Sequence, residues 1–370
     1  MIRILQCVNK MDRAGLETML MNYYRNIDRS QVQFDFLTHR STEGAYDKEI
    51  KEMGGKIYYA PRLIPKNIFK YRRYMKKLFE ENKYDIVHSH IDTMSFFPLR
   101  EANRNKVKYR ISHSHTSKLD IDYKLPIKYY CKIFINKYAN IRFACGKKAG
   151  IFLYNKLNFK ILNNAVDCQK FKFDENLRGK VRNDLGIDEN TTVLGHVGRY
   201  IYIKNQEFLI DVFVDYLQLN SDSKLILVGL GEDEKKLRDK VEKYGIKDKV
   251  IFLVNRSDTN EIYQAMDYFV MPSLFEGVPL VAIEAQTNGL TCILSDKISE
   301  ETKITDNVYF CNLKLGSKEW AKFIYNLDKR RNNNSIIDVK NHCYDIKIEA
   351  KKLENFYINL YEDLEGDYYD

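Results

Sequence analysis

Two carboxylates, Glu276 and Glu284, lie eight residues apart, with a glycine and a proline just after the first. The apolar run Tyr268–Ser273 before them is typical of a buried strand that Pro272 stops, and Val281–Asn288 after them fits a helix. A strand–loop–helix corner leaves free backbone N–H groups that can receive an anion. Because eight residues are just over two helical turns, we expect both acids to reach one cleft. Acids beside an anion site indicate a ligand with hydroxyls and phosphates, such as a nucleotide sugar.

The run Met271–Gln286 closely resembles the Glu-x7-Glu signature of retaining glycosyltransferases with the two-domain GT-B fold, the large family four. The resemblance implies that Glu276 contacts the transferred sugar and that Glu284 holds the ribose hydroxyls. It also implies that backbone groups after Glu276 hold the donor diphosphate, those of Gly277, Val278, Leu280 and Val281. The alternative is that Glu276 is only a helix-terminal acid and that Glu284 lies on a solvated helix face.

Two basic side chains are expected at another strand end. Gly198 and Arg199 end a predicted strand and Lys204–Gln206 opens the next helix, which resembles the family's Gly-Arg-x4-Lys-x-Gln element. Sugar transfer expels a nucleoside diphosphate whose charge grows in the transition state, and Arg199 and Lys204 would stabilise that charge as fixed cations. We therefore expect no metal ion and no cofactor, and interpret the Asp-x-Asp at Asp120–Asp122 as incidental. An ordinary surface pair is the alternative for the two cations.

Further donor contacts follow from the same resemblance. Gly15 opens the first helix, where the family brings backbone close to the donor diphosphate. Val254 stands in Phe252–Asn255, the segment whose backbone commonly contacts the base, although the family usually has glycine at its position. Gly229–Gly231 fits either a turn near the nucleotide or an ordinary strand–helix turn. Asn163–Asp167 resembles the family's Asn-Gly-Val-Asp element at the domain junction and is expected to act as a hinge.

Two His-Ser-His triplets, at residues 88–90 and 113–115, each stand at a predicted strand end. Strand alternation places both histidines of a triplet on one side, which could suggest zinc. No cysteine or carboxylate at ligand spacing completes such a site, so we predict no metal. The family has one histidine after this strand, near the transferred sugar and the acceptor. His115, followed by Thr116, fits best as a catalytic residue, and His113 is the alternative; a hydrogen-bonded strand-terminal histidine is the plain interpretation of either.

Charge is distributed unevenly along the 370 residues. Residues 1–165 carry 32 lysines and arginines against 15 acids, whereas the remainder carries 28 against 36. A basic first half indicates an anionic partner: membrane lipid, a diphosphate-linked acceptor or nucleic acid. An odd number of scattered cysteines, with no C-x-x-C spacing, indicates a reducing compartment without structural zinc. These are Cys7, Cys131, Cys145, Cys168, Cys292, Cys311 and Cys343.

The first residues read as a strand rather than a signal peptide, and no apolar run approaches the ~20 residues of a spanning helix. We expect a cytoplasmic protein, with peripheral attachment to the inner face of the plasma membrane as an option. The basic helix predicted at Leu125–Tyr138 mixes lysines with apolar residues. It fits either contact with an anionic membrane surface or a solvated face packed on a sheet.

Strand and helix patterns alternate in two series, which predicts parallel sheets with helical crossovers. The first series spans residues 1–165 and the second spans 166–345, and a helix of about residues 346–364 follows. We predict an α/β protein of two Rossmann-like domains facing across a cleft. By its resemblance to the GT-B fold, the last segment, 346–370, is expected to cross back to the first, acceptor-side domain; the second domain is expected to bind the nucleotide sugar.

The resemblance implies a retaining hexosyltransferase-type enzyme. Its donor would be a nucleotide sugar, with uridine as the expected base, and its acceptor a lipid-linked glycan of a bacterial surface polysaccharide. A GT-B sugar-nucleotide epimerase or hydrolase is the enzymatic alternative. A nucleic-acid-binding protein is a third interpretation, prompted by the sequence pI of about 8.9. No recognition module or stacking platform supports it, so no nucleic-acid partner is expected.

Overall fold

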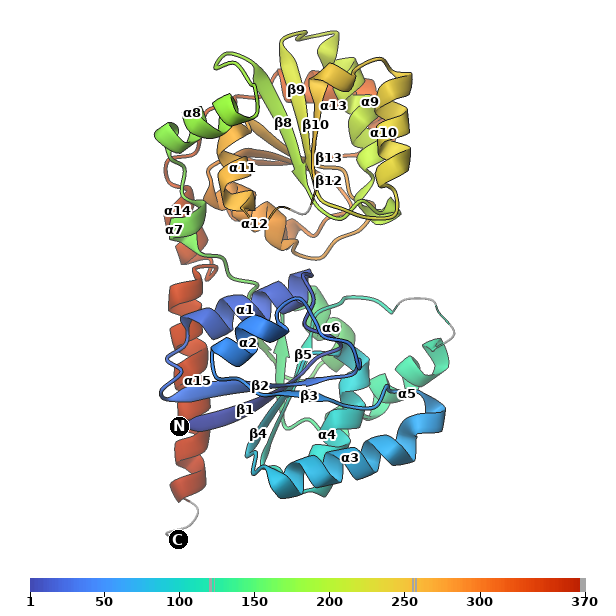
Figure 1. The fold of residues 1–370 in the computed structure, drawn as a ribbon, viewed down its shortest axis with the longest axis vertical. Coiled ribbons are helices and arrows are strands. Elements are labelled where there is room, and N and C mark those ends of the chain that lie inside the picture. The colour runs from blue at the N-terminus through green and yellow to red at the C-terminus, as the bar shows by residue number, and fades with distance from the viewer. Residues whose placement is uncertain (120–121, 123, 255, 257, 367–370) are drawn as a thin grey trace. The chain divides into compact units, whose positions relative to one another are not determined.

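The computed structural model describes residues 1–119, 122, 124–254, 256 and 258–366, without the side chains of 364–366. The chain divides into two compact units (Figure 1). The first unit consists of Met1–Ala165 with Ile346–Asp370, and the second unit consists of Val166–Asp345. Within the described residues, no helix is both long enough and apolar enough to cross a membrane. All seven cysteines are free thiols.

The first unit is built on a seven-stranded parallel sheet in the order β3-β2-β1-β4-β5-β6-β7. Its strands are β1 (Ile2–Cys7), β2 (Val32–Thr38), β3 (Ile57–Tyr59), β4 (Ile86–Ser89), β5 (Tyr109–Ser114), β6 (Ile141–Ala144) and β7 (Lys160–Ile161). The strand order reverses between β1 and β4. In open α/β sheets a ligand binds beyond the carboxyl ends of the strands at such a point.

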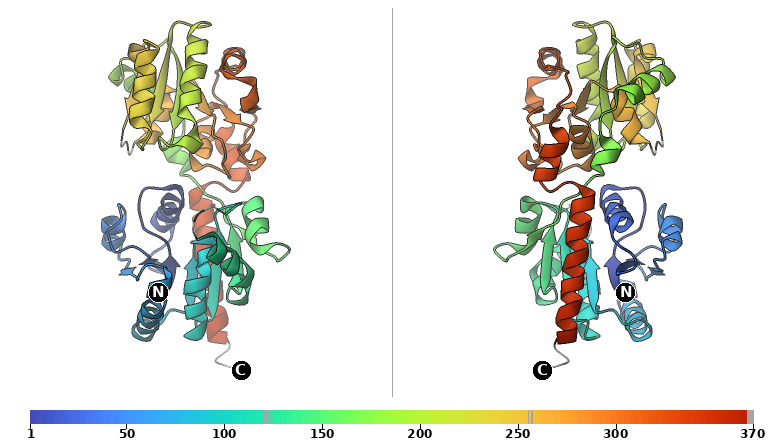
Figure 2. Two further views of the ribbon diagram at one scale, coloured as in Figure 1. Left: turned by 90° about the vertical axis from the view of Figure 1, so that its right-hand side faces the viewer. Right: turned by 90° about the vertical axis from the view of Figure 1, so that its left-hand side faces the viewer.

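Helices cover both faces of this sheet, because its central strands are buried on both sides. One face packs against α1 (Gly15–Asn26) and the C-terminal helix α15 (Ile346–Gly366), which lie side by side (Figures 1 and 2). The other face packs against α3 (Ile68–Glu81), α4 (Phe96–Arg104) and α5 (Leu125–Phe134). The remaining α-helices of this unit are α2 (Asp47–Glu52) and α6 (Lys147–Tyr154).

The second unit repeats the plan with a six-stranded parallel sheet, ordered β10-β9-β8-β11-β12-β13. Its strands are β8 (Thr192–Val197), β9 (Ser223–Val228), β10 (Val250–Leu253), β11 (Tyr268–Met271), β12 (Thr291–Ser295) and β13 (Val308–Cys311). Its α-helices are α7 (Cys168–Phe171), α8 (Glu175–Asp184), α9 (Gln206–Leu217), α10 (Glu234–Lys243), α11 (Thr259–Ala265), α12 (Leu280–Thr287), α13 (Ser317–Tyr325) and α14 (Ser335–Asn341). Here the strand order reverses between β8 and β11.

The predicted α/β class with two Rossmann-like domains is confirmed. Both units alternate strands and helices, as the pattern predicts. The short edge strands β3 and β13 and the helices α4, α6, α7, α8, α13 and α14 were not predicted. An edge strand of three or four residues is too short for a period to be recognised. In α4, Pro98 lies in the first turn, where a proline is tolerated, so the proline signal there marks no helix end.

Candidate active site

The two acids of the motif lie at the reversal point of the second sheet, after β11. Glu276 stands in the loop, held by a backbone bridge to Ile298, and Pro279 precedes the first turn of α12. A Cβ added to Gly277 would meet no atom within 4 Å, so the space over this loop is open. Gly277, Val278, Leu280 and Val281 form the loop and the helix start, where backbone N–H groups are outside the helical ladder.

Lys204 forms an ion pair with Glu276, with Nζ and Oε1 2.7 Å apart. Lys204 belongs to the turn that follows β8, the other strand at the reversal point. Two further bonds tie the segments together: the Leu274 N–H donates to the Ile203 carbonyl at 2.8 Å, and Asn205 Nδ2 donates to the Pro272 carbonyl at 3.1 Å. The structure thus brings an ammonium and a carboxylate, 72 residues apart in sequence, into one site.

Arg199 is exposed just beyond β8, near the same corner of the fold. Its carbonyl oxygen accepts a hydrogen bond from Gln206 Nε2 at 2.7 Å, which fixes the backbone rather than the side chain. Among the described residues, no carboxylate forms an ion pair with its guanidinium. An arginine whose charge is not compensated by the protein can offer both donors of its fork to a phosphate.

Glu284 lies in a different environment from Glu276. It is buried in α12, and Tyr263 of α11 donates its hydroxyl to Glu284 Oε2 at 3.0 Å. Burial raises the pKa of Glu284 to about 7, and the hydrogen bond from Tyr263 partly opposes that rise. Tyr263 was not foreseen, because it precedes Glu284 by 21 residues on another helix. No interaction joins the two acids within the described part of the chain.

The glycine turn at Gly229–Gly231 has a packing role. A Cβ at Gly229 would lie 2.0 Å from the carbonyl oxygen of Gly198, and one at Gly231 would lie 2.2 Å from that of Tyr200. The loop after β9 therefore lies directly against the loop after β8, which supports the interpretation of Gly229–Gly231 as an ordinary strand–helix turn. Val254 is exposed just after β10. Asn255, beside it, lies outside the described residues.

The remaining predicted residues belong to the first unit. Gly15 opens α1 with no atom within 4 Å of an added Cβ, so a ligand could approach its backbone closely. His115 follows β5, is partly exposed, and its backbone N–H donates to Asp92 Oδ1 at 2.6 Å. Its Nε2 lies 3.1 Å from His90 Nδ1, and burial lowers the pKa of its ring to about 3. His113 is fully buried, so of the two candidates only His115 has any exposed surface.

Four imidazoles stack into what we call the histidine cluster, which consists of His88, His90, His113 and His115. The β4–β5 register, which aligns Ser89 with Ser112, places the two triplets side by side. The rings of His88 and His90 are 4.2 Å apart and those of His113 and His115 are 4.1 Å apart. Ring nitrogens of His88, His90 and His113 come within 4.8 Å of one another. The planes of His88 and His113 are 19° apart, whereas those of His90 and His113 are tilted by 46°.

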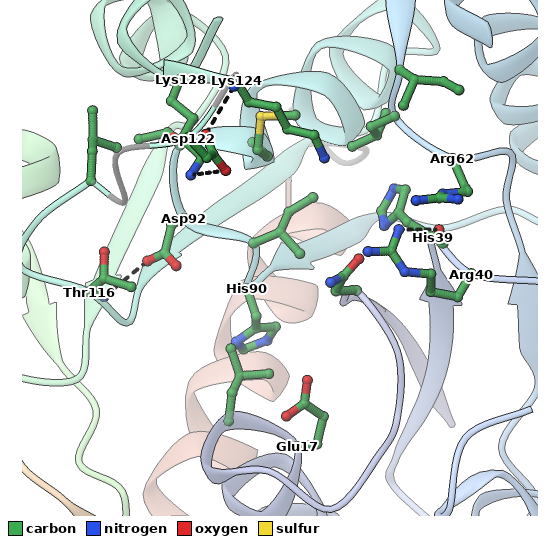
Figure 3. A pocket seen from close by; sticks show the side chains of 18 of the residues that line it. Glu17, His39, Arg40, Arg62, His90, Asp92, Thr116, Asp122, Lys124 and Lys128 are labelled. Atoms are coloured by element: carbon green, nitrogen blue, oxygen red, sulfur yellow. Dashed lines mark hydrogen bonds and ion pairs between the residues drawn. The ribbon is translucent and has the colours of Figure 1, made fainter. Parts of the chain in front are cut away.

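A cavity of about 360 Å³ opens at the reversal point of the first sheet (Figure 3). Five strand ends contribute to its wall: Asn9 follows β1, His39 follows β2, Arg62 follows β3, His90 follows β4 and Thr116 follows β5. We call it the first-unit pocket. Asp122, from the Asp-x-Asp sequence, also lines it and accepts a bond from Lys128 Nζ at 3.0 Å. Asp120 and Ile121, the other members of that sequence, lie outside the described residues.

Two parallel-sheet units, with cations and acids at a reversal point, define the class of GT-B glycosyltransferases. The chain belongs to the family "Glycosyl transferases group 1", whose sequence profile matches residues 178–325. It is similar to EpsF of Bacillus subtilis (strain 168), a glycosyltransferase by provisional assignment, with 33% identity over 81% of this chain and 80% of that protein. The predicted family membership is thereby confirmed.

Two further relatives are similar in sequence, and one solved structure is similar in fold. The capsular polysaccharide biosynthesis glycosyltransferase CapH of Staphylococcus aureus is 26% identical over 97% of this chain and 99% of its own. An Escherichia coli UDP-Gal:alpha-D-GlcNAc-diphosphoundecaprenol alpha-1,3-galactosyltransferase is 29% identical over 60% of each chain. Anabaena Alr3699/HepE, solved in complex with UDP-glucose, superposes with a TM-score of 0.72 at 18% identity, covering 96% of this chain and 94% of that one.

Proposed function

We propose that this protein transfers a sugar from a uridine-diphosphate sugar to a lipid-linked glycan acceptor in surface polysaccharide biosynthesis. We further propose that it retains the anomeric configuration and needs no metal ion. The Lys204–Glu276 ion pair at the reversal point of the second sheet is the observation that carries the proposal. The relatives support a polysaccharide pathway, and the diphosphoundecaprenol substrate of the E. coli relative supports a lipid-linked acceptor.

Each site residue has a role that its surroundings allow. Glu276, paired with an ammonium, faces the transferred sugar, and Glu284 accepts the ribose hydroxyls from its buried position. Arg199 and Lys204, with Gly15 and the backbone from Gly277 to Val281, hold the diphosphate. Val254 lies toward the base. His115 lies near the transferred sugar and the acceptor hydroxyl, with its ring nitrogen Nε2 held by His90.

The transfer step needs no further reactant. The bond between the sugar C1 and the diphosphate oxygen breaks, and the acceptor oxygen forms its bond to C1 on the same face. The acceptor's proton passes to the departing phosphate. The diphosphate gains negative charge as it leaves, and fixed cations stabilise that charge without reorganising. Two side-chain cations can meet this need, so we propose that the chemistry continues without a divalent ion.

A screen of nucleotide sugars for slow acceptor-free hydrolysis tests the donor assignment. We expect one uridine-linked sugar to be cleaved, and NMR of the first product formed with an acceptor to show the donor's anomeric configuration. Inverted product would refute retention, and cleavage of no nucleotide sugar would refute the proposal as a whole. Rapid acceptor-free release of free sugar or of an epimer would instead identify the sugar-nucleotide epimerase or hydrolase alternative.

We also propose that the protein works at the cytoplasmic face of a membrane, through α5. This helix exposes large apolar side chains among lysines, with Tyr129 55% exposed and Ile133 70% exposed. We define the α5 lysines as Lys124, at the helix boundary, with Lys128 and Lys132. A basic helix with exposed apolar side chains matches an anionic lipid surface in both charge and polarity.

A further inference from the structure

The first-unit pocket contains two guanidinium groups, those of Arg40 and Arg62. Arg40 follows β2 and Arg62 follows β3, and both extend from the same side of the pocket (Figure 3). Arg40 Nη1 donates to the carbonyl oxygen of His39 at 3.4 Å. Among the described residues, no carboxylate forms an ion pair with either arginine. Two uncompensated charges in the wall of a concave site attract an anion, because the low-dielectric walls focus their field.

Three acids line this pocket: Glu17 of α1, Asp92 and Asp122, and the last two accept hydrogen bonds from its wall. Asp92 Oδ1 accepts the backbone N–H groups of His115 and Thr116, at 2.6 and 3.1 Å. Asp122 accepts Lys128 Nζ at 3.0 Å and the backbone N–H of Lys124 at 3.0 Å. Their negative charges are therefore partly offset from within the pocket wall. Among the described residues, five cationic side chains (Arg40, Arg62, Lys118, Lys124 and Lys128) line the pocket with these three acids, so the excess of positive charge favours an anionic ligand.

The helix that contributes Lys128 to the pocket also exposes apolar side chains. Lys124, at the boundary of this helix, α5, also lines the pocket. The exposed apolar side chains are Tyr129, Tyr130, Ile133 and Phe134. A ligand that joins an anionic group to a hydrocarbon chain would match both parts, because the anion fills the pocket while the chain leaves along α5. A free anion would use only the first part.

The geometry points to the diphosphate of a lipid-linked acceptor as the ligand of the first-unit pocket, with Arg40 and Arg62 as its guanidinium partners. This inference rests on the proposed function and names the acceptor's binding residues. A guanidinium offers two parallel N–H groups to a phosphate, so two arginines suit two phosphates. The other source of a diphosphate is the donor nucleotide, which we have placed on Arg199 and Lys204 and also on Gly15, whose neighbours Leu16 and Glu17 line this pocket, so the experiment must separate the two.

Calorimetric titration of the full-length protein tests this assignment. The variants are Arg40→Gln and Arg62→Gln, with Arg73→Gln on the exposed face of α3 as a control that removes the same charge outside the pocket. The probes are inorganic pyrophosphate and farnesyl diphosphate, both titrated with UDP present at saturation to occupy the donor site. We expect each pocket variant to weaken both probes about tenfold or more, as expected for the loss of a charged hydrogen bond. Arg73→Gln should change the dissociation constants less than twofold.

The outcomes separate the possible sources of the anion. Pyrophosphate binding that is unchanged in Arg40→Gln and Arg62→Gln would overturn the inference, whatever the donor assay shows. An equal loss of UDP affinity would assign the pocket to the donor instead. Farnesyl diphosphate that binds no tighter than pyrophosphate would remove the lipid from the assignment. Donor hydrolysis should stay at its wild-type rate in both variants. If the wild-type protein itself hydrolyses no donor, that result counts against the proposed function and not against this pocket.

Discussion

The buried position of Glu284 predicts that donor binding depends on pH. Without ligand, burial holds the pKa of this carboxyl at about 7. Ribose hydroxyls that donate to the carboxylate would favour its ionised form and lower that pKa in the complex. Binding must then release a proton from protein molecules that hold one. The affinity for the donor therefore reaches its full value above pH 7 and decreases as the pH falls below the pKa of Glu284 in the free protein.

The size of the effect follows from the two pKa values. If binding returns the pKa of Glu284 from about 7 to its ordinary 4.5, affinity at pH 5.5 is expected to be roughly 30-fold weaker than at pH 8, or ~2 kcal/mol. The donor itself does not contribute to this pH dependence, because the diphosphate of a nucleotide sugar is esterified at both ends and has no group that titrates in this range. Isothermal titration of the hydrolysable donor over minutes at 4 °C, from pH 5.5 to 8.5, measures the dependence directly.

Two variants identify the titrating group. Glu284→Gln should bind the donor weakly and with little pH dependence, because the amide cannot titrate. Tyr263→Phe should move the midpoint to higher pH, because it removes the hydrogen bond that lowers the pKa of Glu284. Wild-type affinity that stays constant between pH 5.5 and 8.5, or an unchanged pH profile in Glu284→Gln, would refute the assignment of Glu284 to the ribose.

Four other predictions follow from the site and the fold. Arg199→Ala and Lys204→Ala should each lower the transfer rate by ~2–4 kcal/mol of transition-state stabilisation, and wild-type turnover in either variant would refute the phosphate role. Activity should survive EDTA, and complete loss that is restored by magnesium or manganese would refute metal independence. Reversal of the α5 lysines to glutamate should release the protein from anionic vesicles in a flotation assay while donor hydrolysis is retained; unchanged vesicle binding would leave α5 as a solvated face. Burial lowers the pKa of each imidazole in the histidine cluster from its ordinary 6.5, so the unfolded chain binds more protons below that pH. The free energy of unfolding should therefore be highest above pH 6.5 and should decrease on acidification by up to ~1.4 kcal/mol per group and pH unit. A melting temperature that is constant from pH 7 to 5 would contradict this.

The part of the site that is continuous in the chain could be predicted from the sequence, whereas the contacts between distant segments could not. Glu276 and Glu284 were recognisable because the strand, the turn and the helix around them are continuous in the chain. Tyr263, which sets the environment of Glu284, comes from another helix, and the sequence carries no signal for that contact. Arg40 and Arg62 belong to separate loops, and only the order of the strands brings them to one pocket.

The histidine triplets show the same limit of prediction from the sequence. Strand alternation correctly placed both histidines of a triplet on one side, because that property belongs to a single strand. Stacking between the triplets depends on the pairing of β4 with β5 and on its register, which are properties of the sheet. The same pairing buries His113 while His115 stays partly exposed. Of the two candidates, only His115, which the sequence already preferred, has exposed surface.

The two acids of the motif differ in the partner that the fold gives them, and this difference supports different roles. Glu276 has an ammonium 2.7 Å away and lies in the loop, whereas Glu284 is buried and, among the described residues, accepts a side-chain hydrogen bond from a phenol hydroxyl alone. An ammonium carries three N–H donors, so Lys204 can keep its bond to Glu276 while it also donates to a departing phosphate. One cation can thus hold the acid beside the sugar and stabilise the leaving group in the same arrangement. Glu284 lacks such a partner, and a ligand with hydroxyl donors is what its buried carboxylate requires.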